Sequence, residues 1–93
     1  MGAQTDVLSA VATADGTMVS GRNRLKGVVM TATTTAGSVV FKDGGSSGTT
    51  RLTFNTPAVA DFHDIIIPGE GVLFTTDIYV DVTNVSSVTI FYG

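Results

Sequence analysis

Residues 78–92 of the chain read IYVDVTNVSSVTIFY, and this stretch decides the fold class. Apolar residues occupy every second position over residues 78–82 and again over residues 88–92, with four residues, 84–87, between the two segments. A period of two is typical of a strand with one buried face, because successive side chains point to opposite sides. The stretch therefore predicts a C-terminal β-hairpin.

The strand pattern continues toward the N-terminus. Segments 38–42 and 49–55 flank a Gly/Ser loop and predict a second hairpin. A helix over residues 6–14 is the one competing interpretation, and its Thr and Val residues disfavour it. Turn signals every 8–12 residues predict an all-β fold, a compact antiparallel β-sandwich or small barrel of seven to eight short strands. The remaining strands are expected at residues 6–13, 17–20, 24–34, 62–67 and 71–75.

The length of 93 residues fits a single small domain. We expect residues 24–93 to form the sandwich core and residues 1–23 to form an N-terminal arm or first hairpin that packs on it. There is no Cys, so no disulfide or cysteine-based metal site can stabilise so small a core.

Charged residues make up only 14% of the chain, against roughly 25% in an average soluble domain. Three runs are apolar without interruption, 28–30, 65–67 and 72–74, so each strand would be apolar on both faces. In a two-layer sandwich one face of each sheet meets water, and a second apolar face therefore points to burial by another subunit. We expect the protein to self-associate.

The charges are divided unevenly along the chain. All five basic residues lie in the first 51 positions, whereas five of the eight acidic residues follow them. The net charge of −3 argues against a nucleic-acid partner, and no apolar run is long enough to span a membrane. Arg22, Arg24 and Lys26 recur at every second position and could dock on an acidic partner surface. With Ile65 and Ile67 they are the candidate partner-docking residues.

No group of residues predicts catalysis. His63 lies between Asp61 and Asp64, but no nucleophile or second acid accompanies it, and a polar cluster on the surface explains it better. Asp77 and Asp81 would be about 13 Å apart on one strand, too far to share a calcium ion. The Gly/Ser loop at residues 44–48 lacks the lysine and helix of a phosphate-binding loop. We expect no enzyme activity, no cofactor and no metal.

Several short motifs recur in an order that resembles a known group of proteins. The chain is similar to short virion proteins encoded by tailed phages of marine bacteria, including cyanophages, over roughly residues 24–93. The resemblance implies a virion structural protein, either a capsid decoration protein or a tail component. The motifs are Lys26–Val29, Ala36–Gly44, Asn55–Pro57, Ile67–Gly71, Asp77–Val80 and Thr89–Gly93.

Composition and resemblance together favour a capsid decoration or cement subunit that is assembled into the virion in the host cytoplasm. Its expected partners are further copies of itself, in a homo-oligomer such as a trimer, and the major capsid protein or another virion protein. The alternative is a glycan-binding adhesion module on a tail or fibre tip. In that case Phe62, Tyr79 or Tyr92 would stack on sugar rings.

Overall fold

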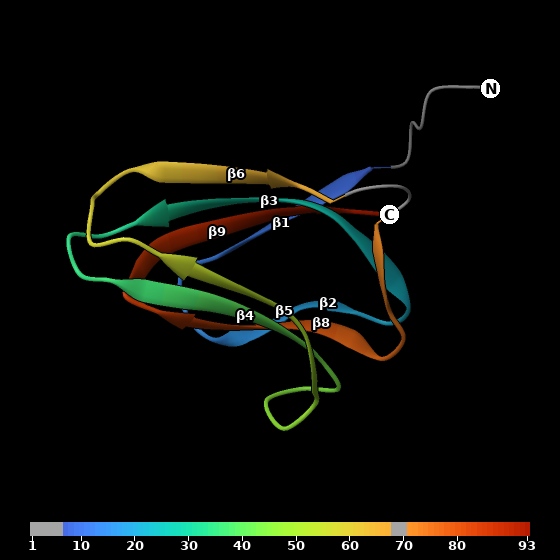
Figure 1. The fold of residues 1–93 in the computed structure, drawn as a ribbon. Helices are drawn as coiled ribbons and strands as arrows, with labels where there is room; N and C mark the ends of the chain where they lie inside the picture. The colour runs from blue at the N-terminus through green and yellow to red at the C-terminus, as the bar shows by residue number, and fades with distance from the viewer. Residues whose placement is uncertain (1–6, 68–70) are drawn as a thin grey trace.

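The computed structural model describes residues 7–67 and 71–93. Within these ranges the chain forms nine β-strands and no helix (Figure 1). The strands are β1 (Leu8–Ala12), β2 (Gly16–Ser20), β3 (Asn23–Ala32), β4 (Gly37–Asp43), β5 (Thr49–Thr56), β6 (Phe62–Ile66), β7 (Val72–Phe74), β8 (Asp77–Thr83) and β9 (Val85–Tyr92).

The strands form two antiparallel sheets that face each other as the layers of a sandwich (Figure 1). One sheet has the order β1-β9-β3-β6, with β7 also paired to β3. The other has the order β2-β8-β4-β5. The predicted all-β sandwich is confirmed, with nine strands instead of seven to eight, and the segment that could have been helical contains strand β1.

The predicted C-terminal hairpin is wrong, although both of its strands exist. β8 pairs with β2 and β4 in one sheet, whereas β9 pairs with β1 and β3 in the other. A first hairpin within residues 1–23 is wrong for the same reason, since β1 and β2 also belong to different sheets; residues 1–6 lie outside the described ranges. Alternation predicts which face of a strand is buried but not which strand lies beside it. The predicted hairpin of β4 and β5 is confirmed.

The crossing from β8 to β9 is built around Asn84, whose φ of 53° lies in the left-handed region. Asparagine tolerates this region better than most residues. The Nδ2 of Asn84 donates to the carbonyl of Ala36 at 3.1 Å, and the carbonyl of Asn84 accepts from Thr33 Oγ1 at 3.0 Å. At the same end of the molecule, the Asp15 carboxylate in the β1–β2 turn accepts from the Val82 N–H at 2.7 Å.

The hydrophobic core lies between the two sheets. Both layers contribute side chains to it. Within the four-stranded sheet, the rings of Phe41 on β4 and Phe54 on β5 meet edge to face with centroids 6.1 Å apart. Burying side chains of this size is the main source of stability in a small domain. The largest fully buried side chains are those of Leu25, Val28, Met30, Val39, Phe41, Phe74, Ile78, Val80, Val88 and Ile90.

Candidate interaction face

The outward-pointing residues of the three apolar runs lie on one surface of the molecule. In each run the middle residue points away from the core: Val29 lies between buried neighbours on β3, Ile66 lies on β6, and Leu73 lies on β7 before buried Phe74. β3, β6 and β7 all belong to the five-stranded sheet. Residues of β1, β6 and β9 extend the same surface. We call this surface the apolar face and define it by Val11, Val29, Phe62, Ile66, Leu73 and Phe91.

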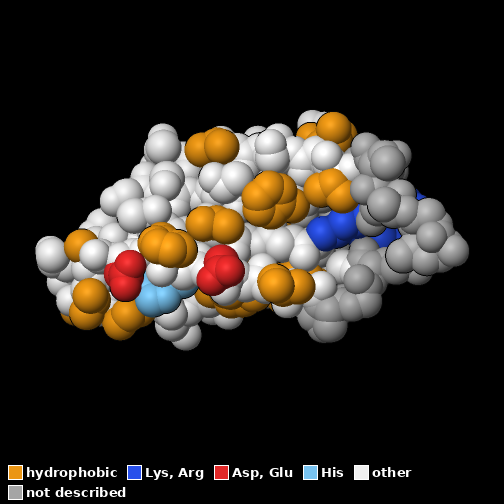
Figure 2. All heavy atoms as spheres, turned by 90° about the horizontal axis from the view of Figure 1, so that it is seen from above, with side chains coloured by type: hydrophobic (Ala, Val, Ile, Leu, Met, Phe, Trp, Pro, Cys, Tyr) orange, Lys and Arg blue, Asp and Glu red, His pale blue; other side chains and the backbone are white. Residues whose placement is uncertain are grey.

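Four of these side chains are strongly exposed. Ile66 is 85% exposed, Val11 68%, Phe62 65% and Phe91 40%. Figure 2 views this side of the molecule and shows hydrophobic side chains in separate clusters across it. Exposed apolar surface of this kind marks interaction sites when it is concentrated on one face.

The outer face of the four-stranded sheet is different. Its outward positions, opposite the buried residues in each strand, carry mostly hydroxyl, amide and charged groups. Lys42 and Asp81 form an ion pair there, with 3.7 Å between Nζ and Oδ2. The sandwich is thus asymmetric, with one apolar and one polar outer surface. The polar side includes Thr17, Ser38, Lys42, Thr53, Asn55, Tyr79, Asp81 and Thr83.

A groove of about 210 Å³ lies near the centre of the apolar face. Gly27 forms its floor and pairs in register with Phe91 on one side and Ile66 on the other. A Cβ at position 27 would already be in van der Waals contact with the Phe91 ring at 3.4 Å and the Ile65 carbonyl oxygen at 3.5 Å, so any larger residue would begin to fill the groove. Lys26 and Asp64 line the same groove, which brings opposite charges to its rim.

The structure places two of the three basic docking candidates on this face. Arg24 pairs in register with Leu73 and alternates with fully buried Leu25, so it points outward. Lys26 stands at a bulge in the pairing of β3 with β9 and lines the central groove. Arg22 is exposed in the turn before β3, because the strand begins at residue 23.

The two isoleucine candidates are corrected by the structure. Ile67 is only 8% exposed and Ile65 is half-buried against the core, so neither presents its side chain to a partner. Ile66, between them, points outward. Because residues 65–67 are all isoleucine, the sequence alone does not show which of them point outward. The β6 register resolves it, because Ile65 lies opposite buried Val28 and Ile66 opposite Gly27.

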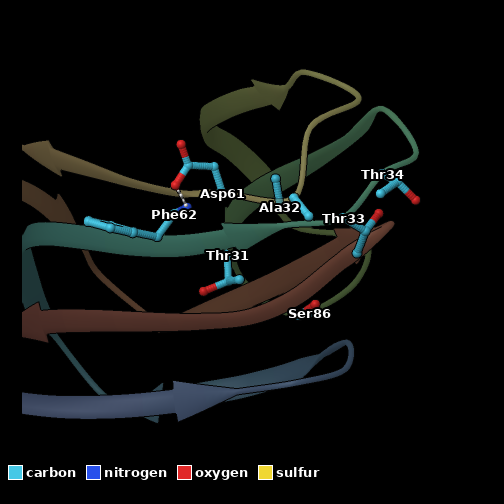
Figure 3. A pocket seen from close by; sticks show the side chains of 8 residues that line it. Thr31, Ala32, Thr33, Thr34, Asp61, Phe62 and Ser86 are labelled. Carbon is cyan, nitrogen blue, oxygen red and sulfur yellow. Dashed lines mark hydrogen bonds between the residues drawn. The ribbon is translucent and has the colours of Figure 1, made fainter.

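An open pocket of about 640 Å³ borders the apolar face where β3 ends and β6 begins (Figure 3). Phe62 stands at its edge, and hydroxyl groups of Thr31 and Ser86 lie nearby (Figure 3). The Asp61 carboxylate accepts from the Phe62 N–H at 2.8 Å. Of the three aromatic residues considered for sugar stacking, only Phe62 is strongly exposed, whereas Tyr79 and Tyr92 are half-buried.

His63 does not form the surface cluster expected from its acidic neighbours. It lies opposite buried Met30 in the β3–β6 register, and its Nε2 atom is buried without a hydrogen-bond partner. Asp64, the next residue, points to the opposite face. The pleat of the strand therefore separates His63 from Asp64.

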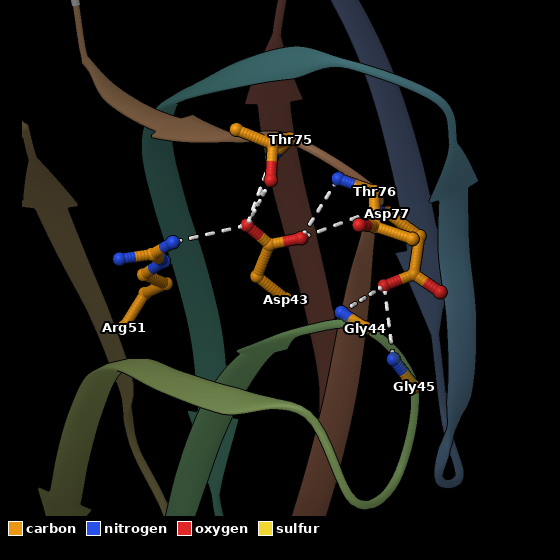
Figure 4. Close-up of polar contacts among 7 residues, drawn as sticks. All are labelled: Asp43, Gly44, Gly45, Arg51, Thr75, Thr76 and Asp77. Carbon is orange, nitrogen blue, oxygen red and sulfur yellow. Dashed lines mark hydrogen bonds and ion pairs between the residues drawn. The ribbon is translucent and has the colours of Figure 1, made fainter.

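The main polar network was not anticipated from the sequence and centres on Asp43, which is 7% exposed (Figure 4). Its Oδ2 accepts from the Thr75 N–H at 2.8 Å, from Thr75 Oγ1 at 3.0 Å and from Arg51 Nη2 at 3.2 Å. Its Oδ1 accepts from the Thr76 N–H at 2.8 Å. The backbone hydrogen bond from Thr75, with those from Thr76, the Thr75 hydroxyl and Arg51, holds the Asp43 pKa far below its ordinary value against the opposing effect of burial.

A second carboxylate completes this network from the opposite strand. Asp77 Oδ1 accepts from the N–H groups of Gly44 at 2.9 Å and Gly45 at 3.1 Å (Figure 4). The Gly/Ser loop after β4 is thus anchored at its start to the β7–β8 turn. Both carboxylates accept hydrogen bonds from backbone N–H groups. The network therefore acts as a structural clamp that joins the end of β4 and its loop to the β7–β8 turn.

Within the described ranges, no cluster of three or more His, Asp or Glu side chains is close enough to hold a metal ion. The same part of the chain contains no helix of sufficient length and hydropathy to cross a membrane. Comparisons with protein-family models, curated proteins and solved structures return no match to this chain.

Proposed function

We propose that the chain is a non-enzymatic virion structural protein, a capsid decoration subunit that acts in many copies. The observation that carries the proposal is the apolar face, where six hydrophobic side chains point outward from one sheet of a small protein. A subunit that binds a lattice buries such a surface against its neighbours and gains stability from that burial. The resemblance to small virion proteins of marine tailed phages supports the same role.

The low charge of the chain suits this role. Charged residues at an interface core are costly to bury, and interface cores are depleted of them. On the apolar face only a few charged residues, among them Lys26 and Asp64 at the central groove, accompany the exposed hydrophobic side chains. A decoration subunit needs adhesion over a broad surface, and the apolar face offers one.

The proposal is tested by binding the purified protein to heads of the encoding phage that lack it. Ile66→Ser and Phe91→Ser should each lower the number of copies bound per head, because each removes an exposed apolar group from the apolar face. Val59→Ser is the matched control, since Val59 is 57% exposed but lies in the loop between β5 and β6, outside the strands that form this face.

Copy number in the mature particle provides a second measurement. A head decoration protein should be present in hundreds of copies, whereas about six or twelve would indicate a tail or vertex component. Equal binding of wild type, Ile66→Ser and Val59→Ser, or complete absence of the protein from heads, would contradict the proposal.

A specific observation favours the second candidate function, glycan binding. An exposed aromatic ring beside hydroxyl groups and a carboxylate can stack on a sugar ring and hydrogen-bond its hydroxyls, and the Phe62 pocket offers this combination. Phe62→Ala should then abolish binding to host surface polysaccharide while Ile66→Ala preserves it. Binding that survives Phe62→Ala would eliminate this candidate.

A further inference from the structure

We propose that the apolar face binds a second copy of this chain, face to face and with the strands of the two copies antiparallel. The inference rests on the self-association included in the proposed function and names the surface, the partner and the orientation. Three features of the face support it: the layout of its charges, the position of Gly27, and its area.

The charges on the face form two pairs of opposite sign with nearly the same centre. Asp64 lies opposite Val29 in the β3–β6 register, three positions along β3 from Lys26. The carbonyl of Asp61 accepts from the Ala32 N–H at 2.7 Å, which places Asp61 beside position 32, eight positions from Arg24. Both pairs are therefore centred close to Val28. Figure 2 shows basic side chains toward one end of this surface and acidic ones toward the other.

This layout selects one orientation. A two-fold axis that lies in the interface and crosses β3 near Val28 reverses the strand direction of the second copy. It brings Lys26 of one copy beside Asp64 of the other, and Arg24 beside Asp61, with each contact occurring twice. A two-fold axis parallel to the strands would instead set basic residues over basic residues and acidic residues over acidic ones. Complementary charges fix orientation and register in this way.

The apolar residues fit the same arrangement. Rotation about this axis sets Gly27 of one copy opposite Val29 of the other, so the groove between Phe91 and Ile66 receives a branched side chain. Matching a recess with a protruding side chain gives close packing at an interface. An isologous contact of this kind closes at two copies, and any larger assembly would use other surfaces.

The size of the face sets the expected affinity. The strands of this sheet contain 31 residues, which at about 3.3 Å per residue and about 4.8 Å between strands offer roughly 500 Å² in each copy. Two copies would bury roughly 1,000 Å², at the lower limit for specific interfaces. We therefore expect a dimer that depends on concentration and weakens as salt is added, because salt screens the charge pairs between the copies.

The test uses analytical ultracentrifugation of charge-reversed full-length chains. Lys26→Glu makes both contacts at positions 26 and 64 acidic in a homodimer, and Asp64→Lys makes both basic. Each variant alone should dimerise at least about tenfold more weakly than wild type. An equimolar mixture of the two should recover a dissociation constant close to that of wild type, because each copy then meets the opposite charge.

Recovery on mixing is specific to contacts between copies, since a folding defect within one copy cannot be repaired by another. Thr17→Glu, at an exposed position on the other sheet, is the control and should dimerise like wild type. Thermal unfolding of each variant verifies that it is folded. Failure of the mixture to recover dimers, or unchanged dimers in Lys26→Glu, would overturn the inference.

The same experiments separate this inference from the proposed function. A wild-type chain that remains monomeric at about 100 µM overturns the inference. If that monomer still coats phage heads, the decoration role stands without the dimer. If instead the wild-type dimer forms but heads do not bind it, the inference stands and the decoration role fails.

Discussion

Asp43 is a residue whose protonation state affects the stability of the fold. Its pKa is held below the ordinary value of 3.8 because the folded protein supplies donors, beginning with the Thr75 N–H, that favour the ionised form. A depressed pKa in the fold contributes stability that is present above the unfolded pKa and is lost as the pH falls toward the folded one. The clamp should therefore weaken below about pH 4.

Asp43→Asn should lower the melting temperature at pH 7 by several degrees, because the neutral amide accepts weaker hydrogen bonds and can present a donor toward the backbone N–H groups. The melting temperature of the variant should also change less than that of wild type between about pH 5 and pH 2. Thermal unfolding followed by circular dichroism across this range measures both effects. Asp81→Asn, at the exposed ion pair with Lys42, is the control, and parallel pH profiles for wild type and Asp43→Asn would contradict the assignment.

Truncation of the adjacent residues Ile66, on β6, and Ile67, just after it, should change the free energy of unfolding by very different amounts. Ile67→Ala removes a side chain that is 8% exposed and should lower the free energy of unfolding by about 2–4 kcal/mol. Ile66→Ala removes one that is 85% exposed and should change it by less than about 0.5 kcal/mol. Urea unfolding of the two variants gives both values, and the reverse order would mean that the strand has the opposite face inward.

At the scale of elements, the sequence predicts strands well and their partners poorly. Alternation over residues 78–82 and 88–92 correctly locates β8 and β9, because burial of one face leaves a period of two. The same alternation would suit a hairpin or a crossing between sheets. Asn84 provides the one local signal, since a single left-handed residue turns the chain from one layer to the other. The β4–β5 hairpin was predictable because glycine-rich residues at its tip favour reversal.

The apolar face was predictable in part from the same strand patterns. Three uninterrupted apolar runs predict that some strands have two apolar faces, and Val29, Ile66 and Leu73 bear this out. The topology that brings these runs onto one sheet depends on long-range pairing with β3, which no local pattern encodes. Asp43 was missed because its partners, Thr75 and Thr76, are more than thirty positions away along the chain.

Gly37 should be essential to the crossing between β8 and β9. A Cβ at this position would collide with the carbonyl oxygen of Thr83 and stand 2.9 Å from the Cβ of Asn84. Gly37→Ala should therefore lower the free energy of unfolding by about 1–3 kcal/mol, since backbone must move to relieve the contact. Gly16→Ala is the matched control, because nothing lies within 4 Å of its added Cβ. Equal stability of the two variants in urea unfolding would contradict this account.

At the scale of the whole molecule, the sandwich combines an apolar outer surface with a polar one on opposite sides. The described part measures 41 × 30 × 18 Å, so the two surfaces are separated by little more than the two sheets. The apolar surface offers one side for association, and the hydroxyl-rich surface on the opposite side is the one that meets solvent.

The crossings between sheets also govern how quickly the chain can reach its final structure. Among the described strands, β4 and β5 form the single pair joined directly in a hairpin, and the other pairings join segments that are distant in sequence. Bringing distant segments together lowers the chain entropy before the contacts between them form. This slows folding to the millisecond-to-second range. Stopped-flow refolding should give relaxation times in that range, and microsecond relaxation would contradict the expectation. Newly made chains would then spend that interval with their isoleucine and valine segments open to aggregation.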